Sequence, residues 1–315
     1  MRIVFMGTAE LACPSLKAVV ATMPRHQVVA VITQPDRPRG RHLTPAPPAV
    51  KATATGLGLN VVQPARIRDE AAVEALRALK PDLIIVVAYG QLLPKNVLDL
   101  PPHGCVNVHT SMLPRWRGAS PIQHAILAGD RETGVTTMYL NERLDAGDII
   151  LQRAEPIHPD DTATTLHNRL ATLGAGLLVE TVELIGTGRM PRTPQDEKQV
   201  TYAKKLARED GRVDWTKPAV EIDRQIRAFD PWPSAYTFWG DTMLKLWKTE
   251  VVATAMGKPG EILPGFVVAA GTGGLRLLEV QPANGKRLSI DAFARGYRLE
   301  TGVILHNAPD RCISK

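Results

Sequence analysis

The sequence predicts an α/β domain, built on a mostly parallel sheet with helices on both faces, followed by a smaller β-barrel domain. Short apolar runs alternate with helix-like stretches in the first half of the 315 residues, and strand-like segments dominate the last third. At about 150 residues per domain, this length predicts two domains. The 44% hydrophobic and 22% charged residues are typical of a globular protein. No apolar run approaches the roughly 18 residues that would span a bilayer.

Each predicted strand of the first domain is a short apolar run. The runs are Arg2–Met6, Gln27–Thr33, Leu83–Ala88, Cys105–His109, Val135–Leu140 and Ile149–Ala154. Helical patterns lie between them, such as Glu70–Lys80 and Pro121–Leu127, whose proline suits a first helical turn. A long leucine-rich helix is expected to begin at Asp161 or Thr162. Strands that alternate with helices in this way indicate a Rossmann-like sheet.

The second half begins with a segment that lacks apolar periodicity, Gly186–Val200. We therefore place the first domain at residues 1–188, a linker at 189–208 and the second domain at 209–315. One amphipathic helix is expected near Ala219–Phe229, before strands at Met243–Val252, Gly265–Ala269 and Leu275–Val280. These short strands and their Gly-rich turns predict an OB-fold-like barrel.

Cysteine usage and the N-terminal residues indicate a cytoplasmic protein. Cys13, Cys105 and Cys312 are odd in number and have no CxxC spacing, so neither a disulfide framework nor a zinc site is expected. Glu10 interrupts the first apolar stretch, which is too short for a signal peptide. The net charge of +6 suits a polyanionic partner, and the basic excess is larger after Thr201 than before it.

A polar pair occupies one predicted strand. Because side chains alternate along a strand, Asn107 and His109 share a face near its C-terminal end, where open parallel sheets bind ligands. A single Asn or His there is more often structural, but an acidic turn around Asp145 follows. If that turn folds over the strand end, Asn107 can stabilise an oxyanion, His109 can donate a proton and Asp145 can stabilise the charged ring. Acyl or formyl transfer to an amine needs such a set.

Covalent and metal-dependent mechanisms have no support in the sequence. Ser111 lacks the GxSxG elbow of a nucleophilic serine, and Cys105 has no basic neighbour in sequence. The eight histidines form no HExxH or similar cluster, so no metal is expected. Direct attack by a substrate amine is the simpler hypothesis.

Several motifs in order and spacing resemble the methionyl-tRNA formyltransferases over almost the whole chain. They are Met6–Ala9, Thr33–Pro38 with Gly40 and Arg41, Val87–Pro94, Asn107–Gly118, Leu144–Asp148, Tyr202–Leu206, Val213–Trp215 and Arg227–Pro233. The resemblance implies formyl transfer from 10-formyltetrahydrofolate to the methionine amine on initiator tRNA. A free α-amine has a pKa of about 7.7–8.0, and esterification to tRNA lowers it, so a neutral nucleophile is available.

The resemblance also implies roles for particular residues. Asn107, His109 and Asp145 match the catalytic residues. The residues expected along tetrahydrofolate are Ser111, Met112, Leu113 and Pro114, and those expected to border the pterin are Gln91, Leu92, Leu93, Asn141 and Glu142.

Basic residues are expected to contact the tRNA. The loop Pro35–Pro48 resembles an insertion that contacts the acceptor end, and its arginines are Arg37, Arg39 and Arg41. Lys204 and Lys205 belong to the later motif and are expected to contact tRNA as well. The loop departs from the family pattern because His42 and Leu43 stand where lysines are common, which predicts a weaker attraction to RNA. We expect a monomer.

Other functions fit less well. Sugar-nucleotide amine formyltransferases share the catalytic set and the folate donor, and some carry a similar barrel. Glycinamide ribonucleotide formyltransferases resemble only the first two hundred residues. A nicotinamide oxidoreductase is disfavoured because the first turn has one glycine, Gly7, where the phosphate-binding motif needs three. An RNA-binding module without activity is disfavoured by the intact catalytic set.

Overall fold

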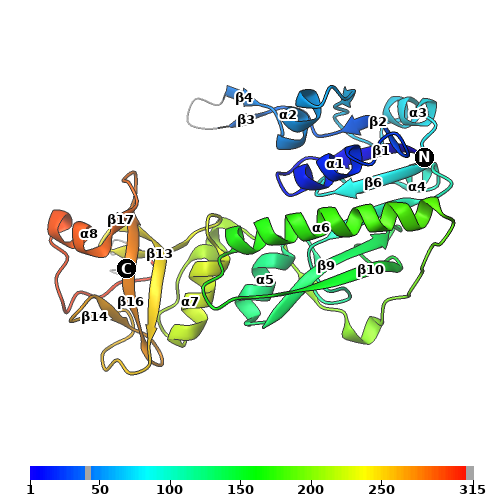
Figure 1. The fold of residues 1–315 in the computed structure, drawn as a ribbon. Helices are drawn as coiled ribbons and strands as arrows, with labels where there is room; N and C mark the ends of the chain where they lie inside the picture. Colours follow the sequence, from blue (N-terminus) through cyan, green and yellow to red (C-terminus); the bar gives the residue numbers. More distant parts are fainter. Residues whose placement is uncertain (40–43, 310–315) are drawn as a thin grey trace. The chain divides into compact units, whose positions relative to one another are not determined.

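The computed structural model describes residues 1–39 and 44–309, which form two compact units (Figure 1). The first unit comprises Met1–Pro121, Glu132–Pro156 and His167–Ala203. The second contains the chain from Lys204 onward together with Ile122–Arg131 and Ile157–Leu166. These two short segments precede the predicted linker. The domain boundaries at 188 and 208 stay a prediction.

A seven-stranded sheet forms the centre of the first unit, in the order β10-β9-β7-β6-β1-β2-β5. The strands are β1 (Arg2–Gly7), β2 (Gln27–Ile32), β5 (Val61–Val62), β6 (Leu83–Val87), β7 (Cys105–His109), β9 (Glu132–Tyr139) and β10 (Ile149–Pro156). The five strands from β5 to β7 run parallel, while β9 is antiparallel to both β7 and β10. This arrangement confirms the predicted, mostly parallel sheet.

Helices cover both faces of this sheet because alternate strand residues are apolar on each side. On one face, strand residues such as Val4 and Ile84 pack with α3 (Glu70–Ala78) and α4 (Lys95–Leu98). On the other face, Gly174 of the long helix α6 (Ala163–Gly186) lies against Val108. Two further helices, α1 (Ala12–Val20) and α2 (Ala49–Gly56), belong to this unit and were not predicted from the sequence.

The second unit is built on a curled antiparallel sheet in the order β12-β13-β16-β15-β14, with β17 beside β16. Its elements are α5 (Pro121–Ala128), α7 (Ala219–Ala228), β12 (Ala235–Trp239), β13 (Thr242–Val252), β14 (Ile262–Leu263), β15 (Val267–Ala269), β16 (Gly274–Pro282), β17 (Leu288–Ser289) and α8 (Ile290–Tyr297). Ile222 and Ile226 of α7 join Leu244 and Leu275 in one buried core. The predicted barrel-type domain is confirmed, although β12, β14, β17 and α8 were missed.

A backbone segment near residue 305 closes this sheet. Phe238 in β12 and His306 exchange two backbone hydrogen bonds of 2.8 and 2.9 Å. On the opposite edge, the N–H of Ile262 donates to Val303 at 2.8 Å, and the N–H of Leu305 donates to Gly260 at 2.8 Å. Both edge strands are therefore paired with one segment, and neither is left as an open template for another chain.

The segment that the sequence predicted as the start of a linker is partly tied to the first unit. Thr193 exchanges backbone hydrogen bonds of 2.9 and 3.0 Å with Ile149. Strand β11 (Tyr202–Ala203) pairs in parallel with β8 (Arg117–Gly118). Across the described ranges, no helix combines the length and apolarity needed to cross a bilayer.

Candidate active site

Asn107 and His109 lie at the C-terminal end of β7, between β6 and β9. Asn107 pairs with Val86 on one side and with Met138 on the other, which fixes its direction. Both side chains line a cavity of about 490 Å³, and both residues are less than a tenth exposed. Asp145 lines the same cavity, so the structure brings the three predicted residues together.

The cavity is open on one side and is lined mainly by loops that follow neighbouring strands. Residues 88–93 follow β6, residues 140–145 follow β9, and Gly118–Pro121 contribute a third wall. Five residues that the resemblance assigned to the pterin border line this cavity: Gln91, Leu92, Leu93, Asn141 and Glu142. The Gln91 side chain also stabilises the loop after β6, because it accepts from the N–H of Ile67 and donates to the main-chain oxygen of Ala65.

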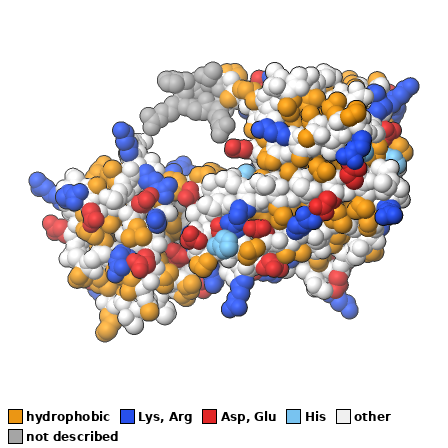
Figure 2. Space-filling view, viewed as in Figure 1, with side chains coloured by type: hydrophobic (Ala, Val, Ile, Leu, Met, Phe, Trp, Pro, Cys, Tyr) orange, Lys and Arg blue, Asp and Glu red, His pale blue; other side chains and the backbone are white. Residues whose placement is uncertain are grey.

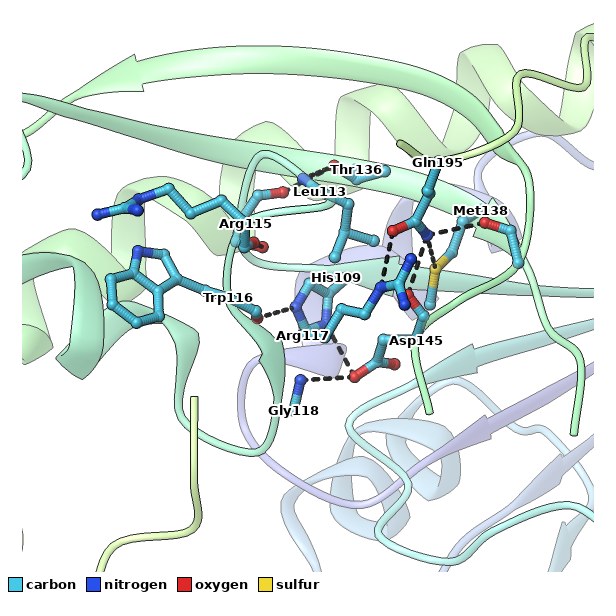
Figure 3. A network of polar contacts seen from close by, with 12 residues as sticks. His109, Leu113, Arg115, Trp116, Arg117, Gly118, Thr136, Met138, Asp145 and Gln195 are labelled. Atoms are coloured by element: carbon cyan, nitrogen blue, oxygen red, sulfur yellow. Dashed lines mark hydrogen bonds and ion pairs between the residues drawn. The ribbon is translucent and has the colours of Figure 1, made fainter. Parts of the chain in front are cut away.

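The His109 ring is held by a hydrogen bond at Nε2, and its other nitrogen lies near Asp145 (Figure 3). Nε2 donates to the main-chain oxygen of Trp116 at 2.9 Å, and Nδ1 lies 3.8 Å from Oδ2 of Asp145. A carbonyl oxygen can only accept, so Nε2 must carry a hydrogen. In the neutral ring, Nδ1 then bears the lone pair and is the atom that can take up a proton beside the Asp145 carboxylate.

Asp145 is fixed by hydrogen bonds to its side chain and its backbone. Its Oδ2 accepts from the N–H of Gly118 at 2.9 Å. Its backbone has a φ of 47°, in the left-handed region that few non-glycine residues adopt. A Cβ at Gly147 would clash with the main-chain oxygen of Tyr139, so only glycine fits there. The turn therefore requires this local sequence.

The sequence analysis gave no role to Gln195, which contacts this turn, or to Arg117, which contacts Gln195. The Gln195 amide donates to the main-chain oxygens of Asp145 and Gly147, and its oxygen accepts from Arg117 (Figure 3). The Arg117 side chain is 1% exposed and pairs with Glu197 at 3.2 Å. This hydrogen-bonded guanidinium holds the pKa of the Glu197 carboxyl below its ordinary value. Gln195 gave no sequence signal because its segment lacks apolar periodicity.

The four residues assigned to tetrahydrofolate by resemblance, Ser111–Pro114, do not line the cavity. Ser111 is fully buried, and its hydroxyl donates to the oxygen of Arg115 at 2.6 Å. Leu113 is held by Thr136, which accepts its N–H, and by Gln152, which donates to its oxygen. These residues follow β7, and two of them, Ser111 and Leu113, are buried. Their contact with the folate stays a prediction.

The chemistry of the cavity matches direct attack better than covalent catalysis. Among the described residues, none makes a hydrogen bond with the Asn107 carboxamide, so its N–H groups are available to a ligand. Burial raises the pKa of the Cys105 thiol to about 12, which keeps it protonated and poorly nucleophilic. Within residues 1–39 and 44–309, no three His, Cys, Asp or Glu side chains gather as metal ligands would.

The residues expected to contact tRNA lie on the surface where they are described. Arg37 is exposed, and its guanidinium donates to Gln34 at 2.6 Å. Arg39 lies in the hairpin strand β3 (Arg37–Arg39), which pairs with β4 (Thr44–Ala46), whereas Arg41 lies outside the described residues. Lys204 and Lys205 are exposed, and Lys204 lies 3.3 Å from Asp210. On the face shown in Figure 2, basic and acidic side chains are mixed within each unit.

Known families and relatives match nearly the whole chain. Residues 1–182 match the formyl transferase family, and residues 205–298 match the formyl transferase C-terminal domain. The chain is 50% identical to the methionyl-tRNA formyltransferase of Moorella thermoacetica over 310 residues, which cover 97% of this chain and 99% of that one. It is 46% identical to the Geobacter sulfurreducens enzyme of the same name, with 98% of each chain covered.

Solved structures share the fold at lower identity. An N-formyltransferase from Helicobacter canadensis, in complex with folinic acid and dTDP-3-aminofucose, matches 91% of this chain and all of its own at a TM-score of 0.66 and 18% identity. HypX from Aquifex aeolicus with tetrahydrofolic acid matches 96% of this chain and 48% of its own at a TM-score of 0.64 and 20% identity. These likenesses support the fold, and the close relatives decide membership: the chain belongs to the methionyl-tRNA formyltransferase family.

Proposed function

We propose that the protein transfers the formyl group of 10-formyltetrahydrofolate to the α-amine of initiator methionyl-tRNA. The observation that carries this proposal is the meeting of Asn107, His109 and Asp145 in one cavity. It occurs in a chain that resembles methionyl-tRNA formyltransferases over nearly its full length.

The cavity suits a flat, partly polar donor such as a pterin. Its volume of about 490 Å³ falls in the range of small-molecule sites. Val86, Leu93 and Leu140 give it apolar walls, while Asn141 and Glu142 offer polar groups at one side. This mixture supports the assignment of Gln91–Leu93, Asn141 and Glu142 to the pterin border.

The reaction begins when the amine nitrogen attacks the formyl carbon. A C–N bond forms, and the carbonyl electron pair moves to oxygen. The Asn107 amide donates to this oxyanion, an interaction typically worth about 2.7–4 kcal/mol of barrier. When the C=O bond re-forms, the bond to the folate nitrogen breaks. The amine loses one proton and the folate nitrogen gains one, so the transfer balances.

His109 is the residue that we assign to this proton transfer. Nδ1 faces the Asp145 carboxylate, whereas Nε2 is committed to the oxygen of Trp116. Nδ1 can accept the proton that the attacking amine loses and deliver it to the leaving nitrogen. The nearby Asp145 carboxylate stabilises the ring while it is charged, and general acid–base catalysis of this kind contributes about 10²–10⁴-fold.

In this proposal, basic residues bind the RNA part of the acceptor, methionyl-tRNA. Arg37, Arg39 and Arg41 of the hairpin loop, with Lys204 and Lys205, would contact phosphates or base edges. Arg37 and the two lysines are exposed, which is consistent with this role. We also expect the enzyme to act as a monomer, which light scattering during size-exclusion chromatography checks.

The test is a formylation assay with purified protein and 10-formyltetrahydrofolate. Methionyl initiator tRNA is the acceptor, methionyl elongator tRNA and uncharged tRNA are controls, and a dTDP-linked amino sugar is the competing acceptor. Formyl-methionine on the initiator tRNA supports the proposal. Turnover of the amino sugar without formylation of the tRNA would refute it in favour of sugar-nucleotide amine formylation.

A further inference from the structure

We infer that Gln195 is a positioning residue that holds Asp145 in the geometry needed for the reaction. This inference rests on the proposed function, in which Asp145 acts on His109. It concerns a residue that does not line the cavity and that lies in the segment that the sequence predicts to be a linker.

The hydrogen bonds of the Gln195 side chain allow only one orientation of its amide group. Nε2 donates to the main-chain oxygen of Asp145 at 2.9 Å and to that of Gly147 at 2.8 Å. Oε1 accepts from Nε of Arg117 at 2.9 Å. A flipped amide would place its oxygen against two carbonyl oxygens and its NH₂ group against a donor, so the orientation is unique.

The turn needs such a contact because its own backbone is strained. Asp145 has a left-handed φ of 47°, which is unfavourable for a residue with a Cβ. Gln195 bonds to the backbone on both sides of Ala146 and therefore spans the turn. The side chain of Asp145 is fixed separately by the N–H of Gly118. Without Gln195, the carboxylate would lose the backbone support that sets its distance from His109.

Gln195 is itself rigidly placed. Two residues before it, Thr193 exchanges two backbone hydrogen bonds with Ile149. Arg117, which donates to Gln195, is 1% exposed and pairs with Glu197. Locked supporting contacts of this kind are what hold a catalytic group within about 0.5 Å of its working position.

The first test compares Gln195→Met with the matched control Gln199→Met. Methionine keeps the approximate side-chain volume but removes the hydrogen bonds to Arg117, Asp145 and Gly147, together with a longer contact of 3.8 Å to the sulfur of Met138. Gln199 lies in the same segment and is exposed, and among the described residues its side chain donates to Asp196 alone. We expect kcat to fall about 10- to 100-fold in Gln195→Met, the cost of a small misplacement of a catalytic group, with both KM values changed less than threefold. The control is expected to match the unaltered protein.

A double-mutant cycle with Asp145→Asn distinguishes positioning from a general structural role. If Gln195 acts through Asp145, Gln195→Met lowers kcat less than about threefold once Asp145 is already replaced. An equal loss in both backgrounds would overturn the inference. Gln195→Glu is the second variant, because it keeps an acceptor for Arg117 but replaces the NH₂ donor with an oxygen. We expect its kcat to fall at least as much as that of Gln195→Met, while its circular dichroism spectrum stays unchanged.

Crystal structures of the unaltered protein and of Gln195→Met test the positioning role without any tRNA substrate. The separation of His109 Nδ1 from Asp145 Oδ2, 3.8 Å in the native arrangement, is expected to grow by about 0.5 Å or more in the variant. An unchanged separation would refute the positioning role. Failure of the unaltered protein to formylate methionyl-tRNA would instead count against the proposed function and leave this measurement valid.

Discussion

The Asp145 carboxylate and the His109 ring approach to 3.8 Å although one comes from a turn and the other from the end of a strand. The pairing depends on Nε2 of His109 being committed to the Trp116 oxygen, which leaves Nδ1 for the acidic partner. The backbone oxygen of Trp116 therefore decides which nitrogen faces Asp145.

Replacement of Asp145 by Asn is expected to slow the chemical step. The variant keeps an oxygen for the N–H of Gly118 but no longer offers a negative charge to the ring. Single-turnover formylation should fall about 10²–10⁴-fold, while the Kd for tRNA changes less than threefold. Asp148→Asn in the same segment is the control, because Asp148 does not line the cavity. A variant that loses tRNA binding but keeps its chemical rate would contradict the assigned role.

Asn107→Leu tests the oxyanion donor. Loss of one such donor typically costs about 2.7–4 kcal/mol of barrier, so kcat should drop about 10²–10³-fold at nearly constant KM. The exposed Asn96→Leu serves as the control. If kcat stays within threefold, another group stabilises the oxyanion.

Cys105 is expected to be dispensable for catalysis. Because burial raises its pKa to about 12, the thiol stays protonated at pH 8 and should resist alkylation by iodoacetamide in the native protein. Peptide mass mapping should find Cys13, which is partly exposed, labelled before Cys105. Cys105→Ala should retain formylation within about threefold. Loss of activity that parallels Cys105 labelling would point to a covalent mechanism.

The Arg117–Glu197 pair predicts an acid-dependent loss of stability. The pKa of Glu197 is lower in the folded chain than its ordinary value, so the pair stabilises the fold above about pH 4.3. This contribution disappears as the pH falls through the folded pKa. The Tm of the native protein should exceed that of Glu197→Gln at pH 7, and the difference should shrink in acid. Glu74→Gln, from an exposed helical pair, is the control.

Salt dependence tests the proposed binding of tRNA phosphates. Removing a cation that neutralises one phosphate should reduce the slope of log K against log salt by about 0.7–0.9. We expect this reduction for Lys205→Ala and for Arg41→Ala, measured by filter binding between 50 and 200 mM KCl, with little change in the formylation rate at saturating tRNA. Lys258→Ala, exposed in the second unit, is the control. An unchanged slope in either variant would argue that the replaced residue does not bind a phosphate.

The sequence predicted six of the seven strands in the first sheet because each is an apolar run, and Cys105–His109 has the predicted bounds. The two-residue strand β5 was missed because it is too short to give such a run. The position of Asn107 and His109 follows from the alternation of strand side chains. Gln195 and Arg117 could not be found in this way, because their contacts join segments far apart in the chain and leave no periodic pattern. Ser111 and Leu113 are buried in the turn after β7, and the contact of Ser111–Pro114 with the folate stays a prediction.

Closure of the second unit by residues 303–306 has a consequence during synthesis. Until the ribosome has released His306, the outer hydrogen-bonding groups of β12 and β14 lack their partners. Because synthesis proceeds at about 5–20 residues per second, the nascent domain spends seconds with two unpaired strand edges exposed to neighbouring chains. Chaperone dependence should therefore be concentrated in the synthesis of this late domain rather than in that of the first.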